Sequence, residues 1–258
     1  MISFFQELYK YRELLKTNVK KEIRGKYKGS FLGVLWSFIN PLLMTLVYAI
    51  VFPFILKNTT PHYVTYLIIG ILPWNWFTMV IAQGTTSFLS NAGIIKKVYF
   101  PREIIPISVV TSGLVNFLIS CLIIIVFLIC SGIGFSKYIL FFPIILIAEY
   151  IVCLAVVFLT SAINVYIKDA EYIINFLVTM LFYATPVLYT MDMFPARFQK
   201  ILLLNPLVTI INSYRNIFFY QVMPGIKSLL IIILVGLVLL YFSYKIFKML
   251  EKGFAEEL

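Results

Sequence analysis

Long apolar runs constrain this sequence more than any other feature. The run from Ile104 to Cys130 contains no charged residue, and four other runs are nearly as free of charge. Each is long enough to form a helix that crosses a hydrocarbon core of roughly 30 Å. The chain is 62% hydrophobic and only 12% charged, whereas about 25% of the residues in a soluble domain are charged. The sequence therefore predicts an integral membrane protein, and because alternating strands are absent, its spans must be helical.

An all-α polytopic fold with six transmembrane helices is expected, in a single membrane domain that covers residues 1–258. Sequence patterns place helix ends only to within a few residues, so the bounds are approximate. The expected spans are residues 34–56, 64–89, 104–130, 139–164, 173–190 and 228–248, of which the first five lie within residues 34–190.

The distribution of Lys and Arg orients these spans. Fifteen of the 21 Lys and Arg residues lie before Ser30, in residues 91–106, in residues 166–171 and near the C-terminal end. Positive charge concentrates on the cytoplasmic side of membrane proteins, so both termini are expected in the cytoplasm and the protein in the cytoplasmic (inner) membrane. The formal net charge of +10 then reflects loops that face anionic membrane lipids, and no nucleic-acid partner is expected.

Residues 3–24 have the pattern of an amphipathic helix. Apolar residues recur at helical spacing, and basic residues occupy the other side. Such a helix lies along the membrane surface with its apolar side in the lipid. The apolar side contains Phe4, Leu8, Tyr11 and Leu15, and the basic side contains Lys10, Arg12, Lys16, Lys20 and Lys21.

The polar segment NAGIIKKVYFPREIIP, residues 91–106, separates the second and third predicted spans. Ile94 and Ile95 stand beside the pair Lys96 and Lys97, as in a short amphipathic helix. Exposed apolar residues rimmed by charge often mark a binding surface. An ordinary cytoplasmic loop that rests on lipid headgroups has the same composition, so the residues alone leave both interpretations open.

The connection between the last two predicted spans is unusually long. Its apolar stretches, Ile201–Leu204 and Leu207–Ile211, are too short to cross a membrane, and Pro195 and Pro206 interrupt them. Two arrangements fit this pattern. The stretches form helices that dip into the outer membrane face, or they form surface helices that rest on lipid.

Nothing in the sequence predicts an enzyme, a metal site or a cofactor held by this chain, because phosphate-binding loops, nucleophile motifs and metal-ligand clusters are missing. Glu149 is the one carboxylate well inside a predicted span. An ionisable residue at this position is a functional candidate, but the structural interpretation is favoured, in which Glu149 is protonated and hydrogen-bonded to a partner such as Asn116 or Gln83. The tryptophans are expected to anchor spans at the membrane interface: Trp36, Trp74 and Trp76.

Two predicted spans carry a stripe of aromatic, hydroxyl and amide side chains. Aromatic rings stack on the apolar faces of sugars while the polar groups form hydrogen bonds with them, so such stripes suit a glycan path. Helix–helix packing uses the same Thr and Asn side chains, and the pattern alone does not decide. The stripes are Phe38, Pro41, Thr45, Tyr48 and Phe52 in the first span, and Tyr172, Asn175, Phe176, Thr179, Phe182, Tyr183, Pro186 and Tyr189 in the fifth.

Four stretches resemble the membrane subunit of polysaccharide-exporting ABC transporters, the permeases for lipid-linked O-antigen, capsule or teichoic acid chains. They are RGKYKGSFLGVLWSFINPL (24–42), NAGIIKKVYFPREIIPIS (91–108), FYATPVLY (182–189) and NPLVTIINSYRNIFF (205–219). The resemblance implies a homodimeric permease that binds two copies of a separate ATPase, which carries the ATP and Mg, and that exports a polyprenyl-pyrophosphate-linked polysaccharide such as O-antigen. Teichoic acid export is the alternative within the family. An ion-coupled carrier or lipid flippase that acts alone is the alternative outside it.

The resemblance also implies roles for particular residues. It makes residues 3–24 an interface helix and residues 195–220 the external gate helices. Basic residues near the cytoplasmic opening are expected from their charge to attract the pyrophosphate. The expected ATPase-coupling helix comprises Asn91, Ala92, Gly93, Ile94, Ile95, Lys96, Lys97, Val98 and Tyr99. The expected glycan path comprises Phe38, Thr45, Tyr48, Phe52, Tyr172, Asn175, Phe176, Thr179, Phe182, Tyr183 and Tyr189. The cytoplasmic opening comprises Arg24, Lys26, Tyr27 and Lys28, and the gate includes Asn205, Pro206, Tyr214 and Arg215.

Overall fold

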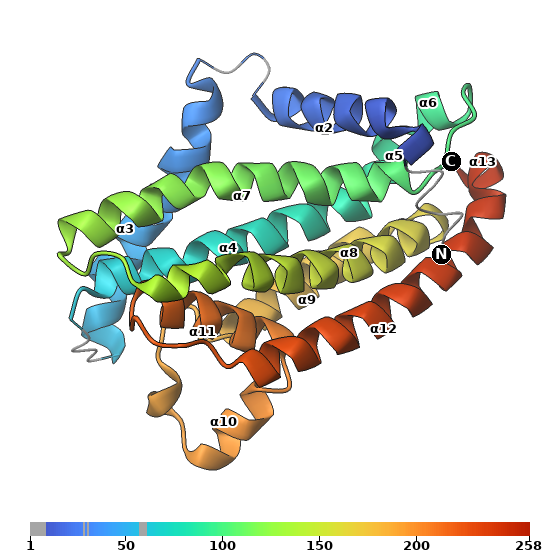
Figure 1. Cartoon of the computed structure of the whole chain (residues 1–258). Coiled ribbons are helices and arrows are strands. Elements are labelled where there is room, and N and C mark those ends of the chain that lie inside the picture. Colours follow the sequence, from blue (N-terminus) through green and yellow to red (C-terminus); the bar gives the residue numbers. More distant parts are fainter. Residues whose placement is uncertain (1–8, 28, 30, 57–60) are drawn as a thin grey trace.

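The computed structural model describes residues 9–27, 29, 31–56 and 61–258, and every regular element in these residues is a helix (Figure 1). The predicted all-α fold is therefore confirmed for the described part of the chain. The elements are α2 (Arg12–Tyr27), η1 (Gly33–Leu35), α3 (Trp36–Leu56), α4 (Tyr63–Thr85), α5 (Ser87–Ser90), α6 (Ala92–Ile95), α7 (Ile104–Cys130), η2 (Lys137–Phe141), α8 (Phe142–Tyr166), α9 (Ala170–Tyr183), η3 (Met191–Met193), α10 (Ala196–Leu202), α11 (Pro206–Phe218), α12 (Ile226–Leu250), η4 (Glu251–Gly253) and α13 (Phe254–Glu257).

Five helical stretches in the described residues are long and apolar enough to cross a membrane. They correspond to the predicted spans one to four and six, whose long apolar runs therefore identified them correctly. The stretches are Trp36–Pro53, Tyr63–Thr85, Ile104–Cys130, Lys137–Tyr166 and Ile226–Gly253.

The fifth predicted span, residues 173–190, is wrong in its second half. Helix α9 ends at Tyr183 and has 14 residues, which cover about 21 Å and fall short of a core of roughly 30 Å. Pro186 explains the stop, because proline lacks the amide donor of a helix and disfavours helical backbone at the residue before it. The following residues form turns, although Thr185 and Val187 are completely buried.

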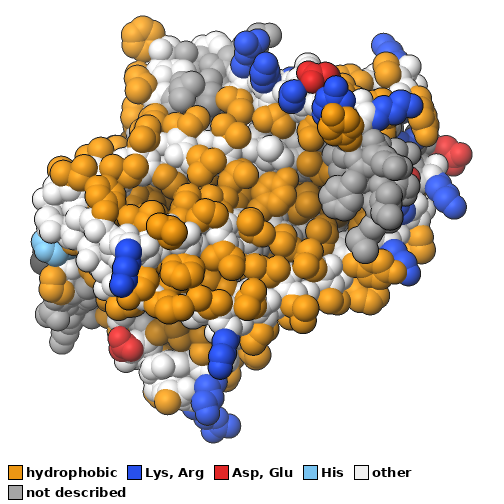
Figure 2. Space-filling model, viewed as in Figure 1, with side chains coloured by type: hydrophobic (Ala, Val, Ile, Leu, Met, Phe, Trp, Pro, Cys, Tyr) orange, Lys and Arg blue, Asp and Glu red, His pale blue; other side chains and the backbone are white. Residues whose placement is uncertain are grey.

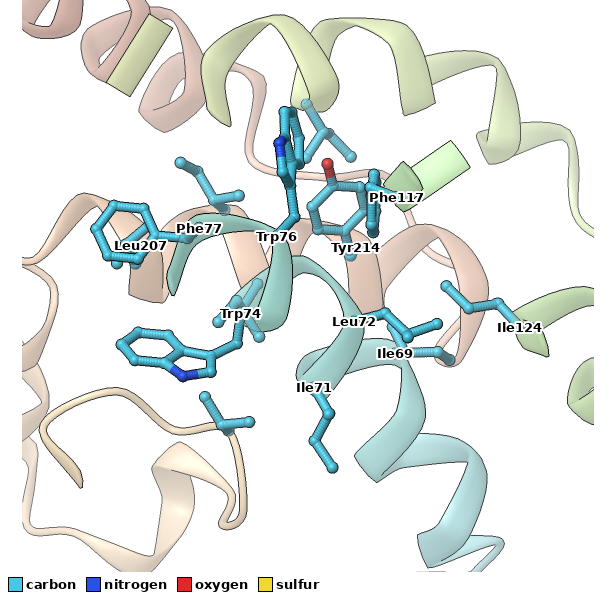
Figure 3. Packing of buried hydrophobic residues seen from close by; sticks show 14 of the residues in the cluster. Ile69, Ile71, Leu72, Trp74, Trp76, Phe77, Phe117, Ile124, Leu207 and Tyr214 are labelled. Atoms are coloured by element: carbon cyan, nitrogen blue, oxygen red, sulfur yellow. The ribbon is translucent and has the colours of Figure 1, made fainter. Parts of the chain in front are cut away.

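Helix α4 forms the centre of the bundle. In its candidate span 78% of the residues are buried, compared with 11% in α3. It contacts α3, α7, α8 and α11. Because Gly84 has no side chain, the side chain of Val157 on α8 lies close to the backbone of α4. Trp74 and Trp76 are 5% and 2% exposed and point to different sides of α4 (Figure 3). The expectation that these two residues are interfacial anchors is therefore wrong.

A second apolar cluster closes the end of the bundle where α5, α6 and α13 lie (Figure 1). The rings of Phe88, Phe247 and Phe254 pack with centroids 4.8 to 5.8 Å apart. Helix α2 lies beside α7 and adds Leu14 and Leu15 to this cluster. The first part of the predicted interface helix, residues 3–8, lies outside the described residues.

The side of the bundle is apolar. Figure 2 shows hydrophobic side chains across its middle, with Lys and Arg gathered around α2, at the end that holds α6 and α13, and around α10. Leu122 and Ile129 of α7 and Leu234 and Val238 of α12 are all at least half exposed. Exposed aliphatic side chains on long helices are those expected of a protein surrounded by lipid.

Candidate functional site

A groove lies between α3 and α9, with α4 as its floor. Its volume is about 510 Å³, within the range of roughly 300–1,000 Å³ that is usual for ligand sites. None of the described residues that line it is charged. The lining residues are Met44 and Tyr48 of α3, Ile71, Trp74, Asn75, Thr78, Met79 and Ala82 of α4, and Asn175, Val178, Thr179, Phe182 and Tyr183 of α9.

Phe182 is the centre of an aromatic cluster in this groove. The centroid of its ring is 6.2 Å from that of Tyr48 and 5.4 Å from those of Trp74 and Tyr183. Phe52 extends the cluster one turn further along α3, with its centroid 5.6 Å from that of Tyr48. These separations are typical of stabilising aromatic pairs. The two predicted stripes therefore meet in the structure, at Tyr48 and Phe52 on one helix and Phe182 and Tyr183 on the other.

Polar groups accompany the rings. The side-chain amide of Asn75 forms no hydrogen bond with any described residue, and it faces the groove. Asn175 and Thr179 lie one turn apart on α9, and the Thr179 hydroxyl donates to the main-chain carbonyl of Asn175 at 2.8 Å. Aromatic rings next to uncharged amides can hold a neutral, hydroxyl-rich molecule by stacking and by hydrogen bonds.

Other predicted path residues lie outside the groove. Thr45 is buried, and its hydroxyl donates to a backbone carbonyl of its own helix at 2.7 Å. Phe38 packs against the main core. Tyr172 and Phe176 are 69% and 63% exposed and do not line the groove. Tyr189 follows the end of α9, where its hydroxyl donates to a backbone carbonyl at 2.8 Å.

Sequence reasoning missed the floor of the groove. Trp74, Asn75 and Thr78 line it from α4, but the prediction looked for path residues only on the first and fifth spans. A signal was present, because Ile71, Asn75, Thr78 and Ala82 are spaced by four, three and four residues and so share one face of a helix.

The polar segment after α4 forms two short helical turns, α5 and α6, followed by extended chain. Ile95 and Phe100 are buried and fix this segment to the bundle, whereas Lys96, Lys97 and Tyr99 between them are exposed. Ile94 and Val98 are 48% and 56% exposed. The Lys21 ammonium of α2 donates to the Asn91 side-chain carbonyl at 2.8 Å. The result is a basic turn with exposed apolar side chains, attached firmly at both ends.

The residues that follow this turn bind the C-terminal end of α12. Arg102 donates to the main-chain carbonyl of Glu251, and the buried Glu103 pairs with Lys248. The Tyr244 hydroxyl also donates to the Glu103 carboxylate, at 3.2 Å. The chain between α6 and α7 is therefore held by α12 as well as by its own neighbours.

Of the residues predicted at the cytoplasmic opening, the structure describes the side chain of Arg24 alone. This side chain is exposed on α2, near the end of the helix. The side chains of Lys26 and Tyr27 and the whole of Lys28 lie outside the described residues.

The connection between α9 and α12 contains one exposed and one buried helix. Helix α10 protrudes from the bundle (Figure 1), and its Phe198 and Ile201 are 55% and 56% exposed. Helix α11 packs against α4 and α8. Asn205 caps it by accepting from the Leu207 amide at 3.0 Å and also donates to the Thr185 hydroxyl at 2.9 Å.

Arg215 of α11 clamps the irregular segment that follows α9. Its guanidinium donates to the carbonyl of Pro186, donates to the carbonyl of Val187 at 2.6 Å, and stacks 3.7 Å from the ring centroid of Tyr66. The hydroxyls of Tyr63 and Tyr66 donate to the next two carbonyls, those of residues 188 and 189, at 2.6 and 2.9 Å. Side chains of α4 and α11 thus supply the donors that a continuous helix would have supplied.

Tyr214 and Arg215 were both predicted in the external gate, yet each is at most 1% exposed. Tyr214 packs among Trp76 and Phe117 (Figure 3), and its hydroxyl bonds to the Glu149 carboxyl group at 2.8 Å. The prediction of Asn116 or Gln83 as the partner of Glu149 is therefore wrong, since a residue far along the chain occupies that position. Glu149 does not line the groove between α3 and α9.

Gly70 is predicted to be indispensable for the Arg215 clamp. A Cβ atom at this position would lie 2.5 Å from Nη2 of Arg215 and 3.3 Å from the Val187 carbonyl oxygen. We expect Gly70→Ala to lower the free energy of unfolding by about 1–3 kcal/mol, the usual effect of overpacking, measured by denaturation in mixed micelles. Gly25→Ala is the matched control, because no atom lies within 4 Å of its Cβ. Equal stability of the two variants would contradict the clamp geometry.

The described structure is that of a helical membrane protein with an uncharged groove between its spans and a basic turn at one end. The model of the family of ABC-2 type transporters matches residues 13–219, so the chain belongs to this family. It is thus a multi-pass membrane protein and the permease part of a transporter rather than a catalytic subunit.

Named relatives are similar over nearly the whole chain. The chain is 34% identical over 260 residues to the O-antigen export system permease protein RfbA of Myxococcus xanthus, with 100% of each chain covered. Two proteins of the same name from Klebsiella pneumoniae are 35% identical over 245 residues, which cover 95% of this chain and 94% of theirs.

Proposed function

We propose that this chain is the permease subunit of an ATP-driven exporter that moves O-antigen or a related polysaccharide, linked to polyprenyl pyrophosphate, across the cytoplasmic membrane. The observation that carries the proposal is the full-length similarity to permeases named for O-antigen export. The groove between α3 and α9 supports it, because aromatic rings beside uncharged amides suit neutral sugars.

Two copies of the chain form one path in this proposal. The two helices that line the groove, α3 and α9, leave apolar residues exposed, including Leu46, Ile173 and Leu177. A second copy with its own α3 and α9 opposite would cover these residues and close two grooves into a single path. The whole chain then acts as one transport domain.

Two copies of a separate ATPase, which bind the ATP and Mg, drive the permease through residues 91–99. Lys96 and Lys97 are exposed there and are suited to acidic groups of the partner. Because Arg102 and Glu103 are bound to α12, a displacement of this turn acts on α7 and α12 together. The transport step follows when the nucleotide favours one of two packings of the helices.

The two ends of the bundle support the proposed membrane orientation, the cytoplasmic opening and the external gate. The end with α5, α6 and α13 is basic (Figure 2), which supports a cytoplasmic location for it and for both termini. Arg24 lies on α2 and is suited to attract the pyrophosphate. At the other end, gating by residues 195–220 falls on the exposed α10, since α11 is fixed by Arg215.

Deletion of the gene from its host tests the proposed function. We expect surface polysaccharide to disappear and lipid-linked polymer to accumulate inside the cell. A plasmid copy of the gene should reverse both changes. Normal surface polysaccharide in the deletion strain would refute the proposal. Accumulation of a different lipid-linked polymer would instead assign the alternative substrate, such as teichoic acid.

The double substitution Lys96→Glu and Lys97→Glu should reduce export and coupled ATP hydrolysis by at least about tenfold. Juxtaposed like charges cost several kcal/mol at an interface, and 1.4 kcal/mol is already tenfold. Both quantities are measured in vesicles that contain the permease and its ATPase. Lys137→Glu with Lys227→Glu is the matched control, because both residues are exposed and belong neither to the basic turn nor to residues 195–220. Normal coupling by the first variant would contradict docking at this turn.

A further inference from the structure

A second cavity lies on the other side of α3, between α3, α4 and α7. Its volume is about 590 Å³, which is enough for a small ligand. Its described lining contains apolar and polar side chains and no charged residue. The polar residues are Ser37, Asn40, Asn75, Thr78, Asn116 and Ser120, and two indole rings accompany them, Trp36 and Trp76.

Several hydrogen-bonding groups of this cavity have no partner in the described structure. The Ser37 hydroxyl donates to the Asn116 side-chain carbonyl at 2.7 Å. By contrast, the side-chain amides of the exposed Asn40 and the half-buried Asn75 form no hydrogen bond with any described residue. Unpaired polar groups are unfavourable inside a membrane protein. Their concentration around one cavity is explained by a ligand that brings its own donors and acceptors.

The chemistry of the lining selects the ligand. The exposed indole ring of Trp36 is suited to stack on the apolar face of a sugar, and amides form hydrogen bonds with pairs of hydroxyls. The absence of Lys and Arg from the lining disfavours a phosphate or pyrophosphate group, which recruits such residues. We propose that this cavity binds a neutral sugar unit of the exported polymer, as a second subsite beside the α3–α9 groove. This inference rests on the proposed function.

The position of α4 explains why two subsites serve one polymer. Asn75, Thr78 and Met79 line both the cavity and the groove, and Met44 of α3 lies between the two. A sugar chain held in the groove therefore contacts the same face of α4 as a sugar unit in the cavity. Two weak, adjacent subsites can hold successive units of a polymer without trapping it.

Photo-crosslinking in cells that export the polymer tests this subsite directly. p-Benzoylphenylalanine is placed at Asn40, which lines only the cavity, at Asn175, which lines only the groove, or at Leu234, which is 66% exposed on α12. After irradiation, the purified permease is probed for attached glycan and for attached phospholipid. We expect glycan at positions 40 and 175 and phospholipid alone at position 234.

Two outcomes overturn the subsite while the proposed function survives. In the first, position 175 captures glycan and position 40 captures only phospholipid. In the second, neither position captures glycan although deletion of the gene removes surface polysaccharide. If the deletion has no effect on surface polysaccharide, the proposed function fails, and the subsite that rests on it fails with it.

A substitution at Asn40 provides an independent measurement. Asn40→Leu keeps the branching and the number of heavy atoms of the side chain but removes its amide, so we expect export in vesicles to fall about fivefold, the factor for one lost hydrogen bond. Asn40→Gln retains the amide and should restore most of the rate. Unchanged export by the leucine variant, at normal protein levels, would refute a role for this cavity.

Discussion

Replacing Arg215 with methionine should lower the free energy of unfolding by about 3–5 kcal/mol, since each hydrogen bond to a charged group contributes roughly 1.5–3 kcal/mol. The substitution removes both donors to the carbonyls of Pro186 and Val187, and these carbonyls have no water around them because the segment is buried. Titration of the purified permease with a denaturing detergent in mixed micelles measures the change.

Two further variants separate the clamp from a general effect of charge. Arg197→Met on the exposed α10 removes the same side chain without a buried partner and should change stability by less than about 0.5 kcal/mol. Arg215→Lys keeps the charge but cannot reach two carbonyls and stack on Tyr66 together, so it should be intermediate. Equal stability of Arg215→Met and Arg197→Met would show that the irregular segment is held by other contacts.

Lys248→Met should be the most damaging change at the opposite end of the bundle. It leaves Glu103, whose side chain is 2% exposed, without its cation. Loss of one member of a buried ion pair costs about 3–5 kcal/mol, and partial exposure of Lys248 places the expected loss near 3 kcal/mol. We also expect ATP hydrolysis to continue with export reduced several-fold, because the chain between α6 and α7 is no longer held to α12.

A double-mutant cycle tests this pair. Glu103→Gln added to Lys248→Met removes the unpaired charge and should recover at least about 1 kcal/mol of stability. Lys245→Met on the same helix is the matched control, since Lys245 is exposed and contacts only the ring of Tyr241. If Lys248→Met and Lys245→Met leave the same export rate, the bond between the basic turn and α12 does not contribute to coupling.

The sequence predicts most of this fold because long apolar runs leave few alternatives. The exceptions are instructive. Residues 173–190 are apolar enough to span, but hydropathy does not account for the backbone hydrogen bonds that Pro186 interrupts. Trp74 and Trp76 match the composition of interfacial anchors, yet they are buried because α4 packs against α3, α7, α8, α9 and α11. A single helix does not reveal how many neighbours it has.

The candidate site was predictable where one helix determines it. The stripes that contain Tyr48 and Phe182 could be read from helical spacing, and the structure brings these residues together. Contacts between distant segments could not be read in this way. The pairs Glu149–Tyr214 and Glu103–Lys248 join residues 65 and 145 positions apart, and only the tertiary arrangement selects one partner for each.

The side-chain donors around residues 186–189 have a consequence for biosynthesis. Tyr63 and Tyr66 leave the ribosome well before these carbonyls, but Arg215 leaves it after them. The segment that follows α9 therefore lacks the two hydrogen bonds from Arg215 at the moment it is made, and a translocon that releases it early would release an unstable segment. Proper insertion of this part of the protein must wait until α11 has been translated and has reached its place against α4.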